Sequence, residues 1–215
     1  MPGSTPTPSP AATRRPLPAR FLGTVSSIPP GLAGSMRGRT WHPGCPVPLP
    51  DLRLLTLRYW GFDGRVHQGP MVVNATAADE VVTVFGRLFR ARFPIERIHL
   101  AIPFRGVDAP PTDRRDFTMG FNCRPALTAR GPLASWSQHA YGLAIDVNPL
   151  QNPYVASDGF IRNYHSRRYG DRPQHLRGMI HPGDAVVRAF TSIGWTWGGD
   201  WSGDQDYMHF SLTGN

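Results

Sequence analysis

The stretch SWSQHAYGLAID, residues 135–146, holds serine, histidine, tyrosine, glycine and aspartate side chains beside a short apolar run. A buried strand would not use so much polar chemistry, and a surface loop does not need the Leu-Ala-Ile run that follows Gly142. Residues 143–147 instead have the pattern of a short buried strand. A histidine just before a turn and an aspartate on the strand that follows can converge on one point. The stretch therefore predicts a functional site.

His139 and Asp146 carry side chains that suit a metal, because imidazole nitrogens and carboxylate oxygens are both common zinc ligands. A third ligand must come from elsewhere. His209 lies in the C-terminal run GWTWGGDWSGDQDYMHFSL (194–212), in a strand-like pattern from which it can reach back to the other two. Asp206, three residues before His209, is a carboxylate near the metal that is not needed as a ligand. Three protein ligands, an open fourth position and a carboxylate base are what metal-assisted hydrolysis requires.

Each of these patterns also has a plainer interpretation. A lone His-x6-Asp pair is more often a satisfied core histidine, and Ser137 could simply cap a turn. The tryptophans at 195, 197 and 201 are more often core or cleft wall than a ligand platform. A Ser–His–Asp triad is disfavoured because the sequence has no G-x-S-x-G turn, and because Ser137 and His139 are too close in sequence.

Composition limits the function classes. The chain has 215 residues and a formal net charge of +8, which favours an anionic partner. Its arginines are scattered and form no basic run with interleaved aromatics, so nucleic acid is disfavoured. No apolar stretch approaches the ~18 residues that a membrane span needs. We expect a monomer.

The first 35 residues stand apart from the rest. Residues 1–20 are rich in Pro, Ser and Thr and nearly free of large apolar side chains. Such a segment cannot bury enough surface to offset the entropy of ordering, so we expect residues 1–35 to form a disordered tail. It also lacks the apolar core of a signal peptide. One folded domain is expected over residues 36–215.

The pattern of that domain indicates mixed helix and strand of the α+β class. Strands are expected at residues 52–60, 71–73 and 98–102, the last from the alternation of Ile98, Leu100 and Ile102. Thr76 and Asp79 imitate a capping box before a helix that ends near residue 93. A second helix is expected over residues 184–193, with Gly194 as its stop. Cys45 and Cys123 are either two unrelated buried thiols or one disulfide.

Several motifs together resemble a known family. The pattern S-x-H-x-x-G-x-A-x-D at residues 137–146, followed by W-G-G-D-W and D-x-x-H-F, resembles the zinc peptidases of the D-alanyl-D-alanine carboxypeptidase superfamily. Within it the sequence is most similar to the VanY-like branch that includes L-alanyl-D-glutamate endopeptidases. The resemblance runs from about residue 41 to 212, through GCPVPLPDLRLL (44–55), FNCR (121–124) and DVNPLQNPYV (146–155).

The resemblance implies a role for individual residues. His139, Asp146 and His209 match the three zinc ligands. Asp206 matches the catalytic carboxylate, which would deprotonate the attacking water and then protonate the leaving amine. Many carboxypeptidase members have glutamate there, and the shorter aspartate is similar to the endopeptidase-like branch. Arg124 matches an arginine that neutralises the oxyanion or a substrate carboxylate.

Ser137 matches a residue that hydrogen-bonds the substrate or the ligands' surroundings. The implied fold is the Hedgehog/D-Ala-D-Ala-peptidase fold, a small antiparallel sheet flanked by helices, in a single domain. With both cysteines inside the matching segments, a Cys45–Cys123 disulfide is expected. The lysostaphin-type zinc peptidases are disfavoured, because they end in a His-x-His pair and position 207 is Tyr.

The sequence thus predicts a Zn²⁺-dependent peptidase of peptidoglycan stem peptides, of the D,D-carboxypeptidase or L-Ala–D-Glu endopeptidase type. Anionic cell-wall polymers are a further expected partner, and the substrate implies an extracellular or cell-envelope location. Two alternatives remain open. One is a phage-type endolysin with the same chemistry, and the other is a non-catalytic, zinc-bearing cell-wall binding module.

Overall fold

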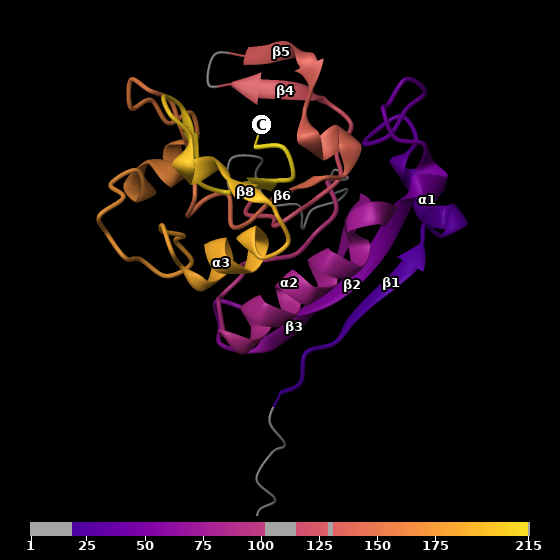
Figure 1. The fold of residues 1–215 in the computed structure, drawn as a ribbon, viewed down its shortest axis with the longest axis horizontal. Coiled ribbons are helices and arrows are strands. Elements are labelled where there is room, and N and C mark those ends of the chain that lie inside the picture. Colours follow the sequence, from indigo (N-terminus) through magenta and orange to yellow (C-terminus); the bar gives the residue numbers. More distant parts are fainter. Residues whose placement is uncertain (1–18, 102–114, 129–130, 215) are drawn as a thin grey trace, which may run out of the picture.

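The first layer of the protein is a three-stranded antiparallel sheet with a helix across one face (Figure 1). The computed structural model describes residues 19–101, 115–128 and 131–214. The sheet has the order β1-β2-β3, formed by Gly23–Ser27, Leu52–Trp60 and Val66–Asn74. Helix α2, Ala78–Arg90, packs against β2 and β1. Every second side chain of β2 from Leu55 to Tyr59 is buried, which is the alternation expected of a strand with one covered face.

The second layer is a smaller antiparallel sheet, with the order β6-β10-β8. Its strands are Ala144–Asp146, His209–Ser211 and Thr196–Trp197. Helix α3, Ala185–Thr191, packs against α2 and β8 and so joins the two layers. Two short antiparallel pairs complete the strands: β4 with β5, Pro125–Thr128 and Gly131–Trp136, and β7 with β9, Tyr154–Val155 and Gln205–Asp206.

Short helical turns occupy several connections. Helix α1 spans Pro30–Met36, and the 3₁₀ turns are η1 Leu49–Asp51, η2 Ala75–Ala77, η4 Gln138–Tyr141, η5 Tyr164–Tyr169 and η6 Gly198–Asp200. The first sheet, α2, α3 and the second sheet share one hydrophobic core, which includes Leu57, Phe85, Ile145, Phe190 and Trp197. Both sheets are therefore held by the same packing. Among the described residues, no helix is long and apolar enough to cross a bilayer.

Several predicted elements are confirmed, and the α+β class fits the mixture of helices and small antiparallel sheets. The strand at 52–60 is β2, the strand at 71–73 is part of the longer β3, and the helix at 184–193 is α3. The capping box is wrong. Asn74, and not Thr76, accepts the capping hydrogen bond, from the backbone N–H of Thr76 at 3.0 Å.

The strand predicted at residues 98–102 does not form within the described residues. Ile98 makes only an isolated parallel bridge with Thr118, and Ile102 lies outside the described residues. An alternating pattern shows that one side of a segment is buried, but a strand also needs a neighbouring segment with which to pair.

The folded part begins earlier than the boundary expected at residue 35. Residues 23–27 form β1 and pair with β2 along their full length, and α1 lies over residues 30–36. Strand β1 lies at the edge of its sheet and most of its side chains are exposed. An exposed edge strand needs few apolar residues, so its composition resembled that of the tail. Residues 1–18 of the expected tail lie outside the described residues.

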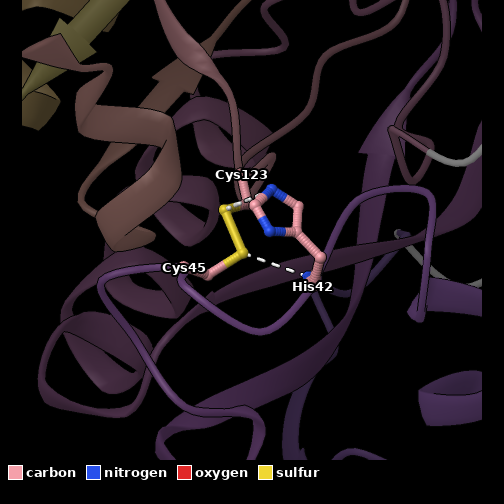
Figure 2. A group of neighbouring side chains, drawn as sticks. All are labelled: His42, Cys45 and Cys123. Atoms are coloured by element: carbon pink, nitrogen blue, oxygen red, sulfur yellow. Dashed lines mark hydrogen bonds between the residues drawn. A yellow bond between two sulfur atoms is a disulfide. The ribbon is translucent and has the colours of Figure 1, made fainter.

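The predicted Cys45–Cys123 disulfide is present (Figure 2), with 5.9 Å between the two Cα atoms. The backbone N–H of His42 donates to the sulfur of Cys45 at 3.1 Å, and the His42 ring lies with its Nε2 3.6 Å from the sulfur of Cys123. Cys123 belongs to a second hydrophobic cluster with Met36 and Leu52. The bridge therefore ties the N-terminal segments to the chain immediately before Arg124.

Candidate metal centre

The segment 135–146 needs its mixed composition because it makes a cap, a turn and a strand in succession. The hydroxyl of Ser137 accepts a hydrogen bond from the backbone N–H of His139 at 3.3 Å, which caps η4. Gly142 ends η4 with φ of +67°, a conformation that favours glycine. The chain then enters the fully buried β6, where Asp146 is the last residue. His139 and Asp146 are thereby brought to the same point.

His209 reaches this point through strand pairing. Strand β10 runs antiparallel to β6, and its register places His209 directly opposite Asp146. The ligand atoms of His139, Asp146 and His209 all lie within 4.8 Å of one another, and all three side chains are buried. The structure thus brings together the three residues predicted as metal ligands.

The donor atoms have the arrangement that a metal needs. The Nδ1 of His139 lies 2.7 Å from the backbone carbonyl oxygen of Gly120, which can only accept, so Nδ1 carries the proton. The Nε2 therefore presents a lone pair. It lies 3.1 Å from the Oδ1 of Asp146 but makes no hydrogen bond to any described residue, and it is buried. A buried nitrogen with its lone pair free is suited to coordinate a cation.

Asp146 is ionised in this environment. Its burial opposes ionisation, but the adjacent imidazoles of His139 and His209 outweigh that effect and hold the pKa of the carboxyl below its usual range. The Nδ1 of His209 lies 3.2 Å from the same Oδ1. One carboxylate oxygen and two imidazole nitrogens are a common set of zinc ligands, so the residues present fit that metal.

Asp206 lies beside the three candidate ligands. It ends β9, three residues before His209, where β10 begins. Its Oδ1 is buried and has no hydrogen-bond partner among the described residues. Burial raises the pKa of Asp206 to about 7, with a further contribution from the nearby charge of Asp146, while His209 and Arg124 oppose the shift. The carboxyl can therefore gain and lose a proton near neutral pH.

Two adjoining cavities meet at this centre. The larger, of about 890 Å³, is lined by His139, His209 and Ser137 and by the ring of Trp201. The smaller, of about 260 Å³, has Asp146 in its wall. The side chains of Arg124 and Asp206 line both cavities. A substrate that occupied both would pass directly over the candidate centre.

The three tryptophans expected in the core or in a cleft wall occupy both kinds of position. Trp195 and Trp197 are core residues, while Trp201 lines the larger cavity, its ring centroid 5.6 Å from that of His209. The observed role of Ser137 is the cap of η4, in addition to its place in the cavity wall.

Sequence reasoning missed the Gly120 carbonyl, because a backbone acceptor leaves no sequence signal. It also missed Tyr154, which lines both cavities and whose hydroxyl donates to Asp204 at 2.6 Å.

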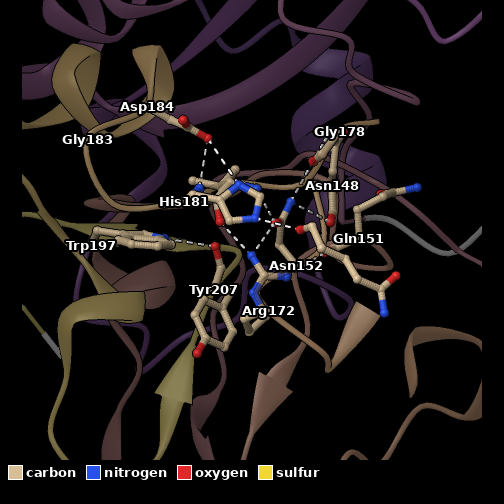
Figure 3. A network of polar contacts seen from close by, with 12 residues as sticks. Asn148, Gln151, Asn152, Arg172, Gly178, His181, Gly183, Asp184, Trp197 and Tyr207 are labelled. Carbon is tan, nitrogen blue, oxygen red and sulfur yellow. Dashed lines mark hydrogen bonds and ion pairs between the residues drawn. The ribbon is translucent and has the colours of Figure 1, made fainter. Parts of the chain in front are cut away.

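A buried polar network supports the chain that follows Asp146 (Figure 3). Asn148 has φ of +46°, and its side-chain amide donates to the carbonyl oxygens of Pro94 and Gly178 at 2.8 and 3.2 Å. Asn152 accepts from the backbone N–H of Ile180 at 2.8 Å. The guanidinium of Arg172 lies 4.0 Å from the ring centroid of Tyr207, the residue that follows Asp206.

The network thus links the turn after β6 to the segment that carries Asp206 and His209. It fixes both sides of the centre to one scaffold.

The family comparison decides what this arrangement resembles. Residues 130–212 match the family model described as D-alanyl-D-alanine carboxypeptidase. The resemblance to the VanY-like peptidases is therefore confirmed over that range. The matched range includes the three candidate ligands and Asp206, but not Arg124. Comparisons with curated proteins and with solved structures gave no match.

Proposed function

We propose that the protein is a zinc-dependent peptidase that hydrolyses amide bonds in peptidoglycan stem peptides. The observation that carries the proposal is the buried group of His139, Asp146 and His209 with Asp206 beside it, inside the stretch that matches the carboxypeptidase family model. The Hedgehog/D-Ala-D-Ala-peptidase fold belongs to the same proposal.

The two histidines and Asp146 would hold the ion. Zinc, when bound, supplies a Lewis acid that polarises a carbonyl group and lowers the pKa of water. Neutral imidazoles are required for this, and the hydrogen bond from His139 to Gly120 selects the tautomer that has its lone pair at Nε2.

Asp206 would move the proton during hydrolysis. As a carboxylate it accepts a proton from the attacking water, and as a carboxylic acid it then donates that proton to the nitrogen of the leaving amine. Arg124, which lines both cavities, would donate hydrogen bonds to the oxyanion or to a substrate carboxylate. Ser137, in the wall of the larger cavity, would hydrogen-bond the substrate.

The burial of Asp206 favours an enzyme over a non-catalytic, zinc-bearing binding module. A carboxyl group beside Asp146, with a buried oxygen that lacks a partner among the described residues, costs folding free energy. A module that only binds a cell wall needs no such group, whereas a proton-transfer residue does.

Location and partners follow from the substrate. We place the protein outside the cell or in the cell envelope, as a monomer, with its net charge of +8 attracting anionic wall polymers. A phage-type endolysin would use the same chemistry.

The test is incubation of the metal-loaded protein with purified peptidoglycan, followed by mass spectrometry of the products. Release of D-alanine indicates D,D-carboxypeptidase activity, and new L-alanine carboxyl and D-glutamate amino termini indicate the endopeptidase type. The Asp206→Asn variant with its metal bound serves as the matched control. Absence of any new terminus with the wild-type protein would contradict the proposal.

A further inference from the structure

The smaller of the two cavities has one charged side chain that the proposed chemistry does not use. Four charged residues line this cavity of about 260 Å³, and three of them, Arg124, Asp146 and Asp206, belong to the candidate centre. The fourth is Arg162. Most of the remaining wall is apolar, and includes Pro149, Ile161 and Met208.

The backbone around Arg162 is held on both sides. Ile161 before it is buried, and its carbonyl oxygen accepts a hydrogen bond from the Nε of Arg167 at 3.3 Å. Asn163 after it caps η5, accepting from the backbone N–H of His165 at 2.9 Å. The backbone position of Arg162 at the cavity wall is therefore set by its neighbours.

The Arg162 guanidinium itself is uncommitted. It is exposed and makes no hydrogen bond, ion pair or ring contact with any described residue. The nearby arginines differ. The guanidinium of Arg167 lies 5.6 Å from the ring centroid of Tyr164, and that of Arg168 lies 4.6 Å from that of Tyr169.

A guanidinium at the wall of a mainly apolar cavity selects for one kind of ligand group. Its planar array of N–H donors matches a carboxylate, with which it can form two parallel charge-assisted hydrogen bonds. The apolar wall meanwhile accommodates the aliphatic part of the same residue. A substrate residue with an amide in place of the carboxylate would keep the apolar contacts and lose the ionic ones.

We propose that Arg162 anchors a free carboxylate of the substrate residue that occupies the smaller cavity. The inference rests on the proposed peptidase function and assigns one specificity determinant to it. A stem peptide with lysine as its diamino acid offers such a carboxylate in two places: the C-terminus of a peptide that ends in D-alanine, and the α-carboxylate of an internal D-glutamate.

Two pairs of synthetic peptides test the inference and separate the two sources. In one pair the C-terminal carboxylate is free or amidated, and in the other the D-glutamate α-carboxylate is free or amidated. For the pair that contains the anchored group, the wild-type protein should have a KM at least about tenfold lower for the acid than for the amide, with similar kcat. Arg162→Gln should abolish that preference by raising the KM of the acid alone, and Arg162→Lys should restore part of it.

Arg168→Gln is the matched control, because it removes an exposed positive charge from the same segment, and Arg168 is not among the residues that line the smaller cavity. It should keep the full preference. If the wild-type protein cleaves none of the peptides, the proposed function itself fails. If it cleaves acid and amide equally well in both pairs, or if Arg162→Gln retains the preference, the function stands and the carboxylate anchor is wrong.

Discussion

At the scale of single residues, the two ring nitrogens of His139 have different roles. The Nδ1–H donates to a backbone carbonyl that no side-chain substitution can remove, which fixes the tautomer and leaves Nε2 for a metal. We predict that the wild-type protein binds about one equivalent of zinc and that His139→Ala lowers its affinity at least about 100-fold. Metal analysis after dialysis against a weak chelator measures both.

His67→Ala is the control for that experiment, because His67 is exposed and pairs with Asp63, which is not one of the candidate ligands. It should bind zinc as the wild-type protein does. Retention of zinc by both His139→Ala and His209→Ala would show that the ligands are assigned wrongly.

Asp206 gives a prediction of a different kind, because it is a neighbour of the ligands and not one of them. Asp206→Asn keeps the size of the side chain but removes the group that accepts a proton. We expect kcat to fall by about 10²–10⁴ while zinc content stays at the wild-type level. Asp200→Asn is the control. It neutralises an exposed aspartate that precedes β9, the strand that ends with Asp206, and it should change kcat little. Near-normal turnover by Asp206→Asn would remove the proposed base from the mechanism.

At the scale of elements, Gly142 sets the turn that joins the first ligand to the second. Its φ is +67°, and a Cβ at this position would lie 2.6 Å from the backbone nitrogen of Asn74, whose N–H donates to the Gly142 carbonyl. Gly142→Ala should therefore combine backbone strain with a clash against the first sheet and destabilise the fold by about 2–4 kcal/mol.

Gly64 offers a matched comparison, since its φ is +73° but a Cβ there would meet open space. Gly64→Ala should cost only the strain, about 1 kcal/mol. Urea denaturation of both variants measures the difference. Equal destabilisation would mean that the close approach to Asn74 does not constrain the turn.

The elements also show which features could be predicted from the sequence. Strand β2 and helix α2 follow from periodicity, because each buries one face against the same core. His139 and Asp146 could be paired because they are close in the chain. The register of His209 opposite Asp146 could be reached only through a family resemblance, since it depends on which strands become neighbours. Arg162 left no signal, because an uncommitted surface arginine resembles any other.

At the scale of the whole molecule, the Cys45–Cys123 bridge closes a loop that contains both strands β2 and β3 and helix α2. In the chain-entropy view a loop of this length stabilises the fold by about 4 kcal/mol. We predict no alkylation of thiols under denaturing, non-reducing conditions. The Cys45→Ala/Cys123→Ala variant should lose about 2–5 kcal/mol of unfolding free energy. Two alkylated thiols in protein from an oxidising compartment would contradict the bridge.

The pH dependence of stability involves a different buried carboxyl, Asp116. Its Oδ1 accepts a hydrogen bond from the backbone N–H of Leu150 at 3.0 Å, but its Oδ2 is buried without a partner among the described residues. Burial raises the pKa of Asp116 to about 6. Because this is above the unfolded value of ~3.9, the folded protein binds more protons between these pH values. The contribution of the protonated Asp116 carboxyl to folding stability is complete below pH ~4 and is lost as the pH rises through ~6.

We therefore expect Asp116→Asn to be more stable than the wild-type protein at pH 7. An asparagine keeps the acceptor for Leu150 and carries no charge to desolvate. From the raised pKa of Asp116, we expect the variant to gain about 1–3 kcal/mol of unfolding free energy at pH 7. The gain should shrink toward zero near pH 4, because the wild-type carboxyl is then neutral too. Urea denaturation of the metal-free proteins at both pH values measures it, with the exposed Asp200→Asn as the control. A variant that is less stable than the wild type at pH 7 would show that the ionised carboxylate has hydrogen-bond donors that outweigh its desolvation.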